Sequence, residues 1–309
     1  MGDFAYFQGS FVPLSEAKIG IMTHAFNYGT GCFEGIRGYW NDTEGQLYLF
    51  RLREHYERLS RSARILGFQL PGDADHLCGL TLELIRRNSA QHDVYVRPIV
   101  YKSSEVVGVR MHNLEDGFAI FATTMGKYID VSGGCRCCIS SWRRVDDNAI
   151  PARAKVTGIY VNSALAKTEA QLNGFDEAIM LTHDGHVSEG SGENIFLVEG
   201  DTLVTPAPSE NILLGITRAT VVQLAREELG IPTVERQVDR SELFTADECF
   251  LTGTAAEITP VVEVDRRPVG SGHVGPVTAQ LQEQFFDVVR GKNRKYQSWC
   301  VPVYAPARA

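Results

Sequence analysis

Apolar residues recur along much of the chain at the spacing of a helix with one buried face. Between residues 52 and 66 they follow one another at steps of three and four: Leu52, Tyr56, Leu59, Ala63 and Leu66. Because an α-helix turns once in 3.6 residues, this pattern predicts an amphipathic helix. Comparable patterns predict helices over about 74–87, 160–172, 216–229 and 276–290. Asn173-Gly174 and Gly230 are typical helix ends.

Shorter apolar runs bounded by turn residues predict strands between these helices. Residues 4–50 are expected to be β-rich, since apolar runs there alternate with turn signals. Further strands are predicted over 94–101, 118–122, 135–140 and 177–181. The last leads through His183-Asp-Gly185 into residues 186–188, which is a hairpin signature. The mixture predicts an α/β (α+β) fold.

A polar stretch with glycines at both ends, residues 126–134, divides the chain. A new strand is predicted directly after it, so we expect an interdomain linker there. A chain of 309 residues is long enough for two modest domains. We therefore expect a small N-terminal α/β domain over residues 1–125 and a large C-terminal domain over 135–309.

Composition narrows the class of protein. A formal charge of −8 and a pI near 5.5 argue against a dedicated nucleic-acid-binding protein. No apolar run is long enough for a membrane span, and no leader pattern opens the chain, so a cytoplasmic protein is expected. The seven cysteines fit cytosolic thiols better than a disulfide framework. Cys135, Cys137 and Cys138 lack the paired spacing of a zinc site, and we expect them to pack in a strand, with no bound metal.

Lys155 is the first candidate for chemistry. Its neighbours are small or apolar apart from Arg153. A lysine that is partly desolvated has a lowered pKa, and its neutral amine can attack a carbonyl group. Lys167 is the competing candidate, but an exposed ion pair with the nearby Glu169 would explain it.

The segment Val187–Phe196 places two acids, Glu189 and Glu193, in a loop kept almost free of side chains by Gly190 and Gly192. Such a loop lets backbone approach a bound group while a carboxylate points at it. An ordinary surface turn is the alternative.

Two further segments are candidate anion sites. Leu214–Arg218 opens a predicted helix, where free N–H groups and the hydroxyl of Thr217 can hold a phosphate. Thr252–Glu257 follows a predicted strand, and Gly253 permits a backbone nest for a second anion. Each could be a simple cap or turn. Arg58 lies on the flank of its helix, from where it can reach a phosphate. Neither segment is a nucleotide-binding loop.

A carbonyl-seeking lysine, a phosphate seat and a carboxylate in a bare loop are the parts that a pyridoxal 5'-phosphate enzyme requires. The lysine binds the cofactor covalently, the helix N-terminus holds its phosphate, and the acid keeps its pyridine nitrogen protonated. This reasoning identifies the cofactor and leaves the substrate open.

These segments resemble the branched-chain amino acid aminotransferases, which belong to the fold-type IV (class IV) pyridoxal-phosphate aminotransferases. The resemblance extends from about residue 5 to 300. It is carried by Met22–Arg37, Arg51–Leu59, Tyr95-Val-Arg-Pro98, Lys155 with Tyr160, Ser188-Glu-Gly-Ser-Gly-Glu-Asn194, Gly215-Ile-Thr-Arg218 and Gly253-Thr-Ala-Ala-Glu-Ile-Thr-Pro260.

The resemblance implies a two-domain fold similar to D-amino acid aminotransferase, with the cofactor at the interface between the domains. The large C-terminal domain would be the cofactor-binding domain. It implies a homodimer or an assembly of dimers. Lys155 would be the Schiff-base lysine and proton shuttle, Glu189 would pair with the pyridine nitrogen, and Tyr160 with the 3′-oxygen. The remaining cofactor-binding residues would be Arg58, Ile216, Thr217 and Thr254 at the phosphate and Leu213 against the ring.

The same resemblance implies the substrate site. Tyr95 and the Thr254-Ala255 backbone would receive the α-carboxylate, and Arg97 the distal carboxylate of glutamate. The apolar pocket would be lined by Phe33, Gly35, Tyr128 and Tyr160, with Tyr28 and Val109 from the partner subunit. The implied reaction is transamination between leucine, isoleucine or valine and 2-oxoglutarate, giving branched-chain 2-oxo acids and L-glutamate. The partners are therefore small amino acids and 2-oxo acids, with no nucleic acid and no membrane.

One segment departs from the family pattern. Arg110-Met-His112 stands where many relatives have an Asn-Pro type turn. Because this loop shapes the pocket, a related class IV transaminase of widened specificity, including (R)-amines or D-amino acids, is the alternative. Aminodeoxychorismate lyase is another rival within the superfamily, disfavoured by Tyr95 with Arg97. A non-catalytic cofactor-binding module is the rival from another class, disfavoured because it would not need Lys155.

Overall fold

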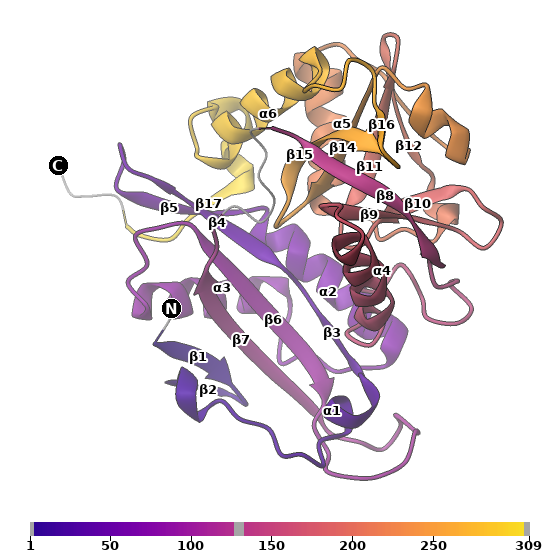
Figure 1. The fold of residues 1–309 in the computed structure, drawn as a ribbon. Helices are drawn as coiled ribbons and strands as arrows, with labels where there is room; N and C mark the ends of the chain where they lie inside the picture. The colour runs from indigo at the N-terminus through magenta and orange to yellow at the C-terminus, as the bar shows by residue number, and fades with distance from the viewer. Residues whose placement is uncertain (1–2, 127–132, 306–309) are drawn as a thin grey trace. The chain divides into compact units, whose positions relative to one another are not determined.

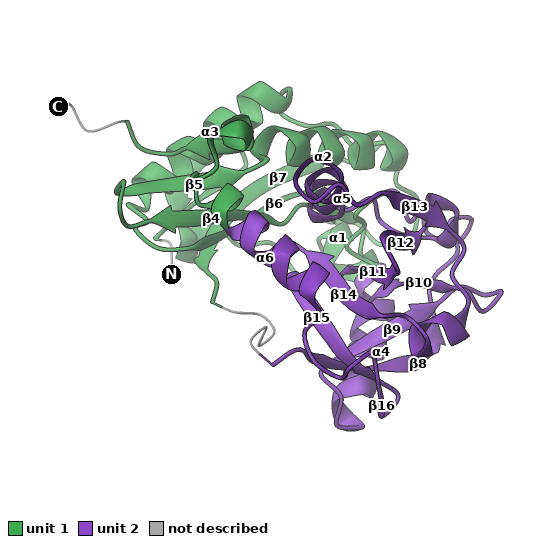
Figure 2. Cartoon of the chain, turned by 90° about the horizontal axis from the view of Figure 1, so that it is seen from above, with its two compact units in different colours: residues 1–126, 154–158, 287–309 green, residues 127–153, 159–286 purple. Residues whose placement is uncertain are grey.

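The computed structural model describes residues 3–126 and 133–305, so most of the expected linker and Tyr128 lie outside the described residues. Two compact units are coloured separately in Figure 2. Unit 1 comprises residues 1–126, 154–158 and 287–309, and unit 2 comprises residues 127–153 and 159–286. The chain thus leaves unit 1, returns briefly around Lys155 and returns again at its end.

Unit 1 is built on an antiparallel sheet with eight strands among its described residues. Its order is β17-β5-β4-β6-β7-β1-β2, and β3 pairs with β6 (Figure 1). The strands are β1 (Phe4–Phe7), β2 (Ser10–Pro13), β3 (Gly31–Phe33), β4 (Ile36–Asn41), β5 (Gln46–Phe50), β6 (Val94–Lys102), β7 (Asp116–Thr124) and β17 (Cys300–Pro302).

Helices α2 (Leu52–Leu66) and α3 (Ala74–Arg87) cover one face of this sheet (Figure 1). The predicted stripe is confirmed, since Leu52, Tyr56 and Leu59 are fully buried against the strands. Gly67 ends α2 in the left-handed conformation that glycine adopts without strain. The shorter helical elements are α1 (His24–Tyr28), η1 (Leu14–Glu16) and η4 (Arg294–Trp299).

Unit 2 contains a mixed sheet with nine strands among its described residues. Its order is β10-β9-β8-β15-β14-β11-β12-β13, and β16 pairs with β15 (Figures 1 and 2). The strands are β8 (Cys135–Arg143), β9 (Glu177–Leu181), β10 (Val187–Gly190), β11 (Asn194–Glu199), β12 (Thr202–Pro206), β13 (Thr233–Arg236), β14 (Glu248–Gly253), β15 (Glu257–Val264) and β16 (Arg267–Pro268).

The helices of unit 2 fall where the apolar periodicity predicts them. They are α4 (Tyr160–Leu172), α5 (Ile216–Glu228) and most of α6 (Pro276–Val289), with the shorter η2 (Pro208–Glu210) and η3 (Arg240–Phe244). The predicted hairpin is also confirmed, because β9 and β10 pair in antiparallel register. No helix in the described ranges has the length and apolar character that crossing a membrane requires.

The core of unit 2 gathers residues from strands across the sheet. Cys135 and Cys137 are fully buried in it, beside Ile195 and Leu251, so these cysteines pack in a strand as expected. On the other face of β11, Phe196 stacks on Phe250 with the ring centroids 5.1 Å apart. Burial of these apolar side chains is the main stabilising contribution.

The segment that carries Lys155 is fixed to unit 1 by backbone hydrogen bonds. Phe33 N donates to Lys155 O at 3.1 Å, and Thr157 N donates to Gly31 O at 2.8 Å. These hydrogen bonds are possible because the backbone at Gly29 lies very close to the backbone at Gly158. Gly29 has a φ of 66°, and a Cβ there would stand only 2.8 Å from the Cα of Gly158. Both the conformation and the contact require glycine.

We expect Gly29→Ala to destabilise the protein and to displace the segment around Lys155. Gly45 is the matched control, because it also has a positive φ of 58° but a Cβ added there would meet nothing within 4 Å. Gly45→Ala should cost about 1–2 kcal/mol for the left-handed conformation alone. Gly29→Ala should cost clearly more in the free energy of unfolding measured with denaturant. Equal costs would contradict the proposed importance of the contact with Gly158.

Candidate active site

Lys155 lies in unit 1 beside the helix that carries Arg58. Its backbone N donates to Ser62 Oγ at 3.2 Å, and Ser62 stands one helical turn after Arg58 on α2. The Lys155 ammonium nitrogen lies 5.1 Å from the ring centroid of Phe33, and the side chain is half-buried. The structure therefore brings Lys155 and Phe33 together with the Arg58 helix.

Arg58 is buried and paired with an acid that the sequence did not single out. Its Nε and Nη2 donate to the two oxygens of Glu34, each at 2.7 Å. His55 Nδ1 lies 2.7 Å from the same carboxylate. Burial alone would raise the pKa of Glu34, but the Arg58 guanidinium outweighs it and, with His55, holds that pKa well below its usual range. Burial lowers the pKa of His55, so the imidazole is neutral and donates through Nδ1.

A second group of predicted residues surrounds Tyr95 on β6. Its hydroxyl accepts hydrogen bonds from Arg97 Nε at 3.1 Å and Nη2 at 2.6 Å. The Arg97 guanidinium also lies 4.2 Å from the centroid of the Phe33 ring. A Cβ at Gly35 would meet the Tyr95 hydroxyl at 2.3 Å, so only glycine leaves room for this ring. The four residues predicted around the substrate are thus neighbours in unit 1.

Tyr28 and Val109 lie at an exposed edge of unit 1. The Tyr28 hydroxyl accepts from Gly108 N at 3.0 Å, and His24 Nε2 donates to Gly108 O at 2.7 Å. These bonds fasten the loop that includes Val109 to α1. The Val109 side chain is 81% exposed, so this loop presents an apolar side chain to its surroundings.

The loop predicted over Val187–Phe196 is wrong at Glu189, which lies on strand β10 as a buried and charge-paired carboxylate. Arg144 Nη2 lies 2.8 Å from its Oε1. Its Oε2 accepts from Asn194 Nδ2 at 3.0 Å and from Leu213 N at 3.1 Å. A cation and N–H donors favour the ionised form. This environment suits a carboxylate that must stay negative inside the protein.

The same Asn194 amide links Glu189 to the start of α5. Its Nδ2 also donates to Leu213 O at 2.8 Å. A Cβ at Gly215, the N-cap of α5, would stand 2.1 Å from Asn194 Oδ1. Within the described residues no side chain caps this helix, so its first N–H groups are available for an anion. Ile216 and Thr217 are the first two helical residues, as predicted.

The turn between β14 and β15 lies beside this cluster. Thr252 is the register partner of Asn194, so their side chains share one face of the sheet. The Thr252 hydroxyl is buried and has no hydrogen-bond partner in the part of the chain that the structure describes. Thr254 and Ala255 in the turn are half-buried. Glu189, Leu213, the α5 terminus and this turn therefore converge in unit 2, while Tyr160 begins α4.

Lys167 has a different partner from the one expected. The proposed pair with Glu169 is wrong, because residues two apart on a helix do not face each other. Lys167 Nζ lies 2.5 Å from Glu177 Oε2 and donates to Asp176 O at 2.7 Å. Glu169 instead accepts hydrogen bonds from Ser140 and Ser141. Lys167 is therefore paired with the buried carboxylate of Glu177.

Sequence reasoning assigned no role to Glu34, Asn194 or Arg144. Glu34 and Asn194 lie inside the segments that resemble the family, and this position was the sequence feature that could have indicated a role for them. Arg144 follows β8 in a polar stretch and gave no local signal of its pairing with Glu189.

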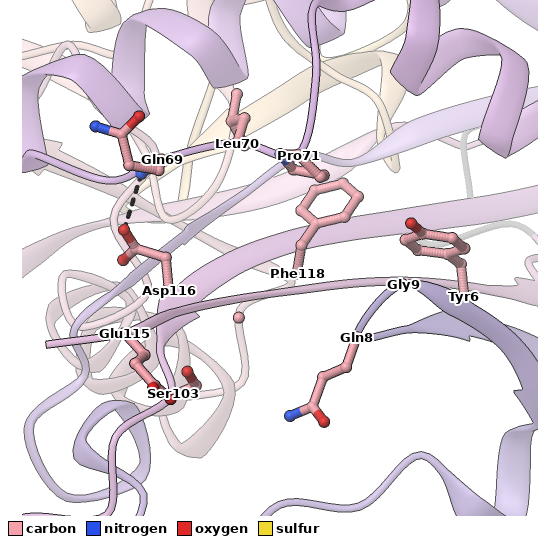
Figure 3. A pocket seen from close by; sticks show the side chains of 11 residues that line it. Tyr6, Gln8, Gly9, Gln69, Leu70, Pro71, Ser103, Glu115, Asp116 and Phe118 are labelled. Carbon is pink, nitrogen blue, oxygen red and sulfur yellow. Dashed lines mark hydrogen bonds between the residues drawn. The ribbon is translucent and has the colours of Figure 1, made fainter.

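Unit 1 also contains a cavity of about 690 Å³, shown in Figure 3. Gln69 N donates to Asp116 Oδ2 at 2.9 Å on one side of it. No residue predicted to bind cofactor or substrate lines this cavity among the described residues. Its lining is Tyr6, Gln8, Gly9, Gln69, Leu70, Pro71, Ser103, Glu115, Asp116, Gly117 and Phe118.

Comparison with known proteins adds independent information. The family model described as amino-transferase class IV matches residues 31–264. The chain is 53% identical to a probable branched-chain-amino-acid aminotransferase of Aquifex aeolicus, over 98% of this chain and 97% of that protein.

Solved structures are similar over almost the whole length. The branched-chain aminotransferase of Thermoproteus uzoniensis with norvaline has a TM-score of 0.94 at 45% identity, covering 98% of this chain and all (100%) of the other. The pyridoxal-phosphate form of the branched-chain amino acid aminotransferase of Thermobaculum terrenum has a TM-score of 0.94 at 36% identity, covering 98% and 99%.

We expect Glu34→Gln to destabilise unit 1 strongly at neutral pH, because it leaves the buried Arg58 without its ionic partner. The cost should be about 3–5 kcal/mol. Since the pKa of Glu34 is lowered, its contribution is present above the ordinary value of 4.5 and is lost as the pH falls toward the folded-state pKa.

Thermal unfolding of wild type and Glu34→Gln between pH 3 and 8 measures this effect. The difference in stability should shrink at the acid end. Glu83→Gln, at an exposed pair with Arg87, is the control and should change stability little. A difference that stays constant down to pH 3 would argue against the ion pair as its cause.

Proposed function

This chain belongs to the class IV amino-transferase family, and from that premise we propose that it exchanges amino groups between leucine, isoleucine or valine and 2-oxoglutarate. Relatives that share 39–53% of their residues with it are named as branched-chain-amino-acid aminotransferases. Its cofactor is pyridoxal phosphate. The single observation in the structure that carries the proposal is the buried carboxylate of Glu189, held by Arg144 beside the uncapped start of α5.

The chemistry of the side chains fits this cofactor. A pyridine nitrogen needs a negatively charged partner, and the Glu189 carboxylate is paired with the Arg144 guanidinium and accepts from N–H donors. A phosphate needs N–H donors, and α5 begins without a side-chain cap in the described residues. The buried Thr252 hydroxyl, without a partner there, leaves a further polar atom close to this terminus.

Pyridoxal phosphate, when bound, supplies a carbonyl group that joins amines covalently and a ring that accepts electrons from the substrate carbon. Lys155 would hold the cofactor through its ε-amine. Once an amino acid has displaced it, the same amine would take the proton from the α-carbon and deliver it on the cofactor side, acting as general base and then general acid.

Glu189 would keep a proton on the ring nitrogen, and Tyr160 would donate to the 3′-oxygen. Arg58, Ile216, Thr217 and Thr254 would bind the phosphate, with Leu213 packed against the ring. Two donors of Arg58 already bind Glu34, so that pair would fix the direction in which the guanidinium acts.

Tyr95 and the Thr254-Ala255 backbone would bind the α-carboxylate of the substrate. The two hydrogen bonds from Arg97 would make the Tyr95 hydroxyl a stronger donor, and Arg97 would also receive the distal carboxylate of glutamate. Phe33, Gly35, Tyr128 and Tyr160 would line the apolar pocket. One site could then serve branched side chains through apolar contact and glutamate through charge.

We also propose that the protein forms a homodimer, because unit 1 exposes apolar side chains along one edge. Ile21, Val107 and Val109 are each more than 80% exposed, and Phe26 is 68% exposed. Exposed apolar side chains at neighbouring positions are typical of an interface. Tyr28 and Val109 would enter the pocket of the partner subunit from this edge. All seven cysteines remain thiols in the described residues, which supports a cytoplasmic location.

We expect wild type to transfer amino groups from L-leucine, L-isoleucine and L-valine to 2-oxoglutarate, and Lys155→Ala to lose at least about a thousandfold in turnover. Lys292→Ala, at an exposed ion pair, is the control and should retain activity. Borohydride should fix the cofactor mass on wild type and not on Lys155→Ala. A donor panel with D-amino acids and (R)-1-phenylethylamine tests the alternative. Preference for either of those donors over L-leucine would overturn the proposed substrate.

We expect Val109→Asp to convert the homodimer to monomers, because it places a charge in the proposed apolar interface. Light scattering after size-exclusion chromatography measures the mass, and turnover should fall with it. Val234→Asp, at another exposed valine in unit 2, is the control. If wild type is itself a monomer and fully active, the dimer proposal is wrong.

A further inference from the structure

Glu193 is a buried acid that the proposed reaction does not use. Its side chain is only 5% exposed, and its Oε2 accepts a hydrogen bond from Gly192 N at 3.0 Å. Its backbone O accepts from Gly190 N at 2.6 Å. The residue thus closes the short turn that joins β10, which carries Glu189, to β11, which begins at Asn194.

Gly190 makes room for this carboxyl group, and Gly253 lies within contact distance of its side chain. A Cβ at Gly190 would stand 2.8 Å from Glu193 Oε2, and a Cβ at Gly253 would stand 3.5 Å from Glu193 Cγ. The side chain therefore lies against both the β10–β11 turn and the start of the β14–β15 turn. The second turn presents Thr254 and Ala255, whose backbone we assign to the substrate carboxylate.

Within the ranges that the structure describes, charged groups that act on Glu193 lie on β9, β10 and α4. Glu177 on β9 and Glu189 on β10 are acids, and Lys167 on α4 is a cation that lies 2.5 Å from Glu177. Burial raises the pKa of Glu193 to about 8, with Glu177 as the next cause. Near neutral pH the carboxyl group is therefore mostly protonated and adds no charge behind the β14–β15 turn.

We propose that Glu193 is a positioning residue whose neutral carboxyl group holds the two turns together, and whose ionisation weakens the binding of a carboxylate at Thr254-Ala255. The inference rests on the proposed function, since it takes that backbone as the carboxylate site. A negative charge behind the turn repels an anion in front of it, because charges interact strongly where water is excluded. Glutamine keeps the shape of the protonated acid and cannot ionise, so Glu193→Gln isolates this effect.

The first experiment measures binding of 4-methylvaleric acid to the holoenzyme by calorimetry between pH 6.5 and 9.5. This ligand has a branched chain and a carboxylate but no amine, so it does not titrate in this range. The ratio of the Kd of wild type to the Kd of Glu193→Gln should increase by about fivefold or more between pH 7 and pH 9. Glu83→Gln, an exposed acid on α3, should follow wild type.

The second experiment measures thermal unfolding of the same proteins over pH 5 to 9 and does not depend on any ligand. Because the folded-state pKa of Glu193 is raised, its stabilising contribution is complete below the ordinary value of 4.5 and is lost as the pH rises through about 8. The melting temperature of Glu193→Gln should therefore rise relative to that of wild type between about pH 5 and 8 and stay level above that, and the control should show no such change.

Parallel pH profiles of wild type and Glu193→Gln in both experiments would overturn the inference. Tyr95→Phe separates this from failure of the proposed site. If that variant binds 4-methylvaleric acid as tightly as wild type, the assignment of the carboxylate site is wrong and the inference is overturned with it. If Tyr95→Phe weakens binding while Glu193→Gln leaves the pH profile unchanged, the site stands and only the role of Glu193 is wrong.

Discussion

The side-chain amide of Asn194 connects the parts of unit 2 on which the proposed chemistry depends. One NH₂ group donates to the Glu189 carboxylate and to Leu213 O, while the amide oxygen lies against Gly215. Strand β10, which carries Glu189, and the start of α5 are separated by some twenty residues in sequence, and this one side chain fixes them together. A rigid arrangement of this kind is what a bound cofactor requires, because small displacements of its partners weaken positioning and charge stabilisation alike.

Unit 1 uses a buried ion pair for the same purpose. Glu34 satisfies Arg58 with two parallel hydrogen bonds and receives a third from His55. A fully buried charge is tolerated only when it is paired and hydrogen-bonded in this way. The guanidinium is thereby held in one orientation on α2, one turn from the serine that binds the backbone of Lys155.

Local sequence patterns predict the elements well and the pairings poorly. The helix from Leu52 to Leu66 and the strand Glu177–Leu181 are predicted with their observed bounds. Burial of one helical face produces a periodic apolar pattern, and burial of a whole strand produces a short apolar run. The bonds from Glu34 to Arg58 and from Arg144 to Glu189 join residues far apart in sequence, so no local pattern contains them. The glycine-bearing segment supplied Glu189 as a candidate and the family resemblance supplied Tyr95, whereas the partners that orient them came from the structure.

The return of residues 154–158 and 287–309 to unit 1 constrains how the protein is made. Strand β17 pairs with β5 across about 250 residues of intervening chain, and the lysine segment pairs with β3. The N-terminal sheet therefore stays without its edge strand β17 until residues 300–302 have been synthesised. Contacts this distant slow folding and leave β5 open to mispairing during synthesis. Neither unit can be cut out as one continuous fragment, and truncation near residue 300 would damage the domain that begins at the other end of the chain.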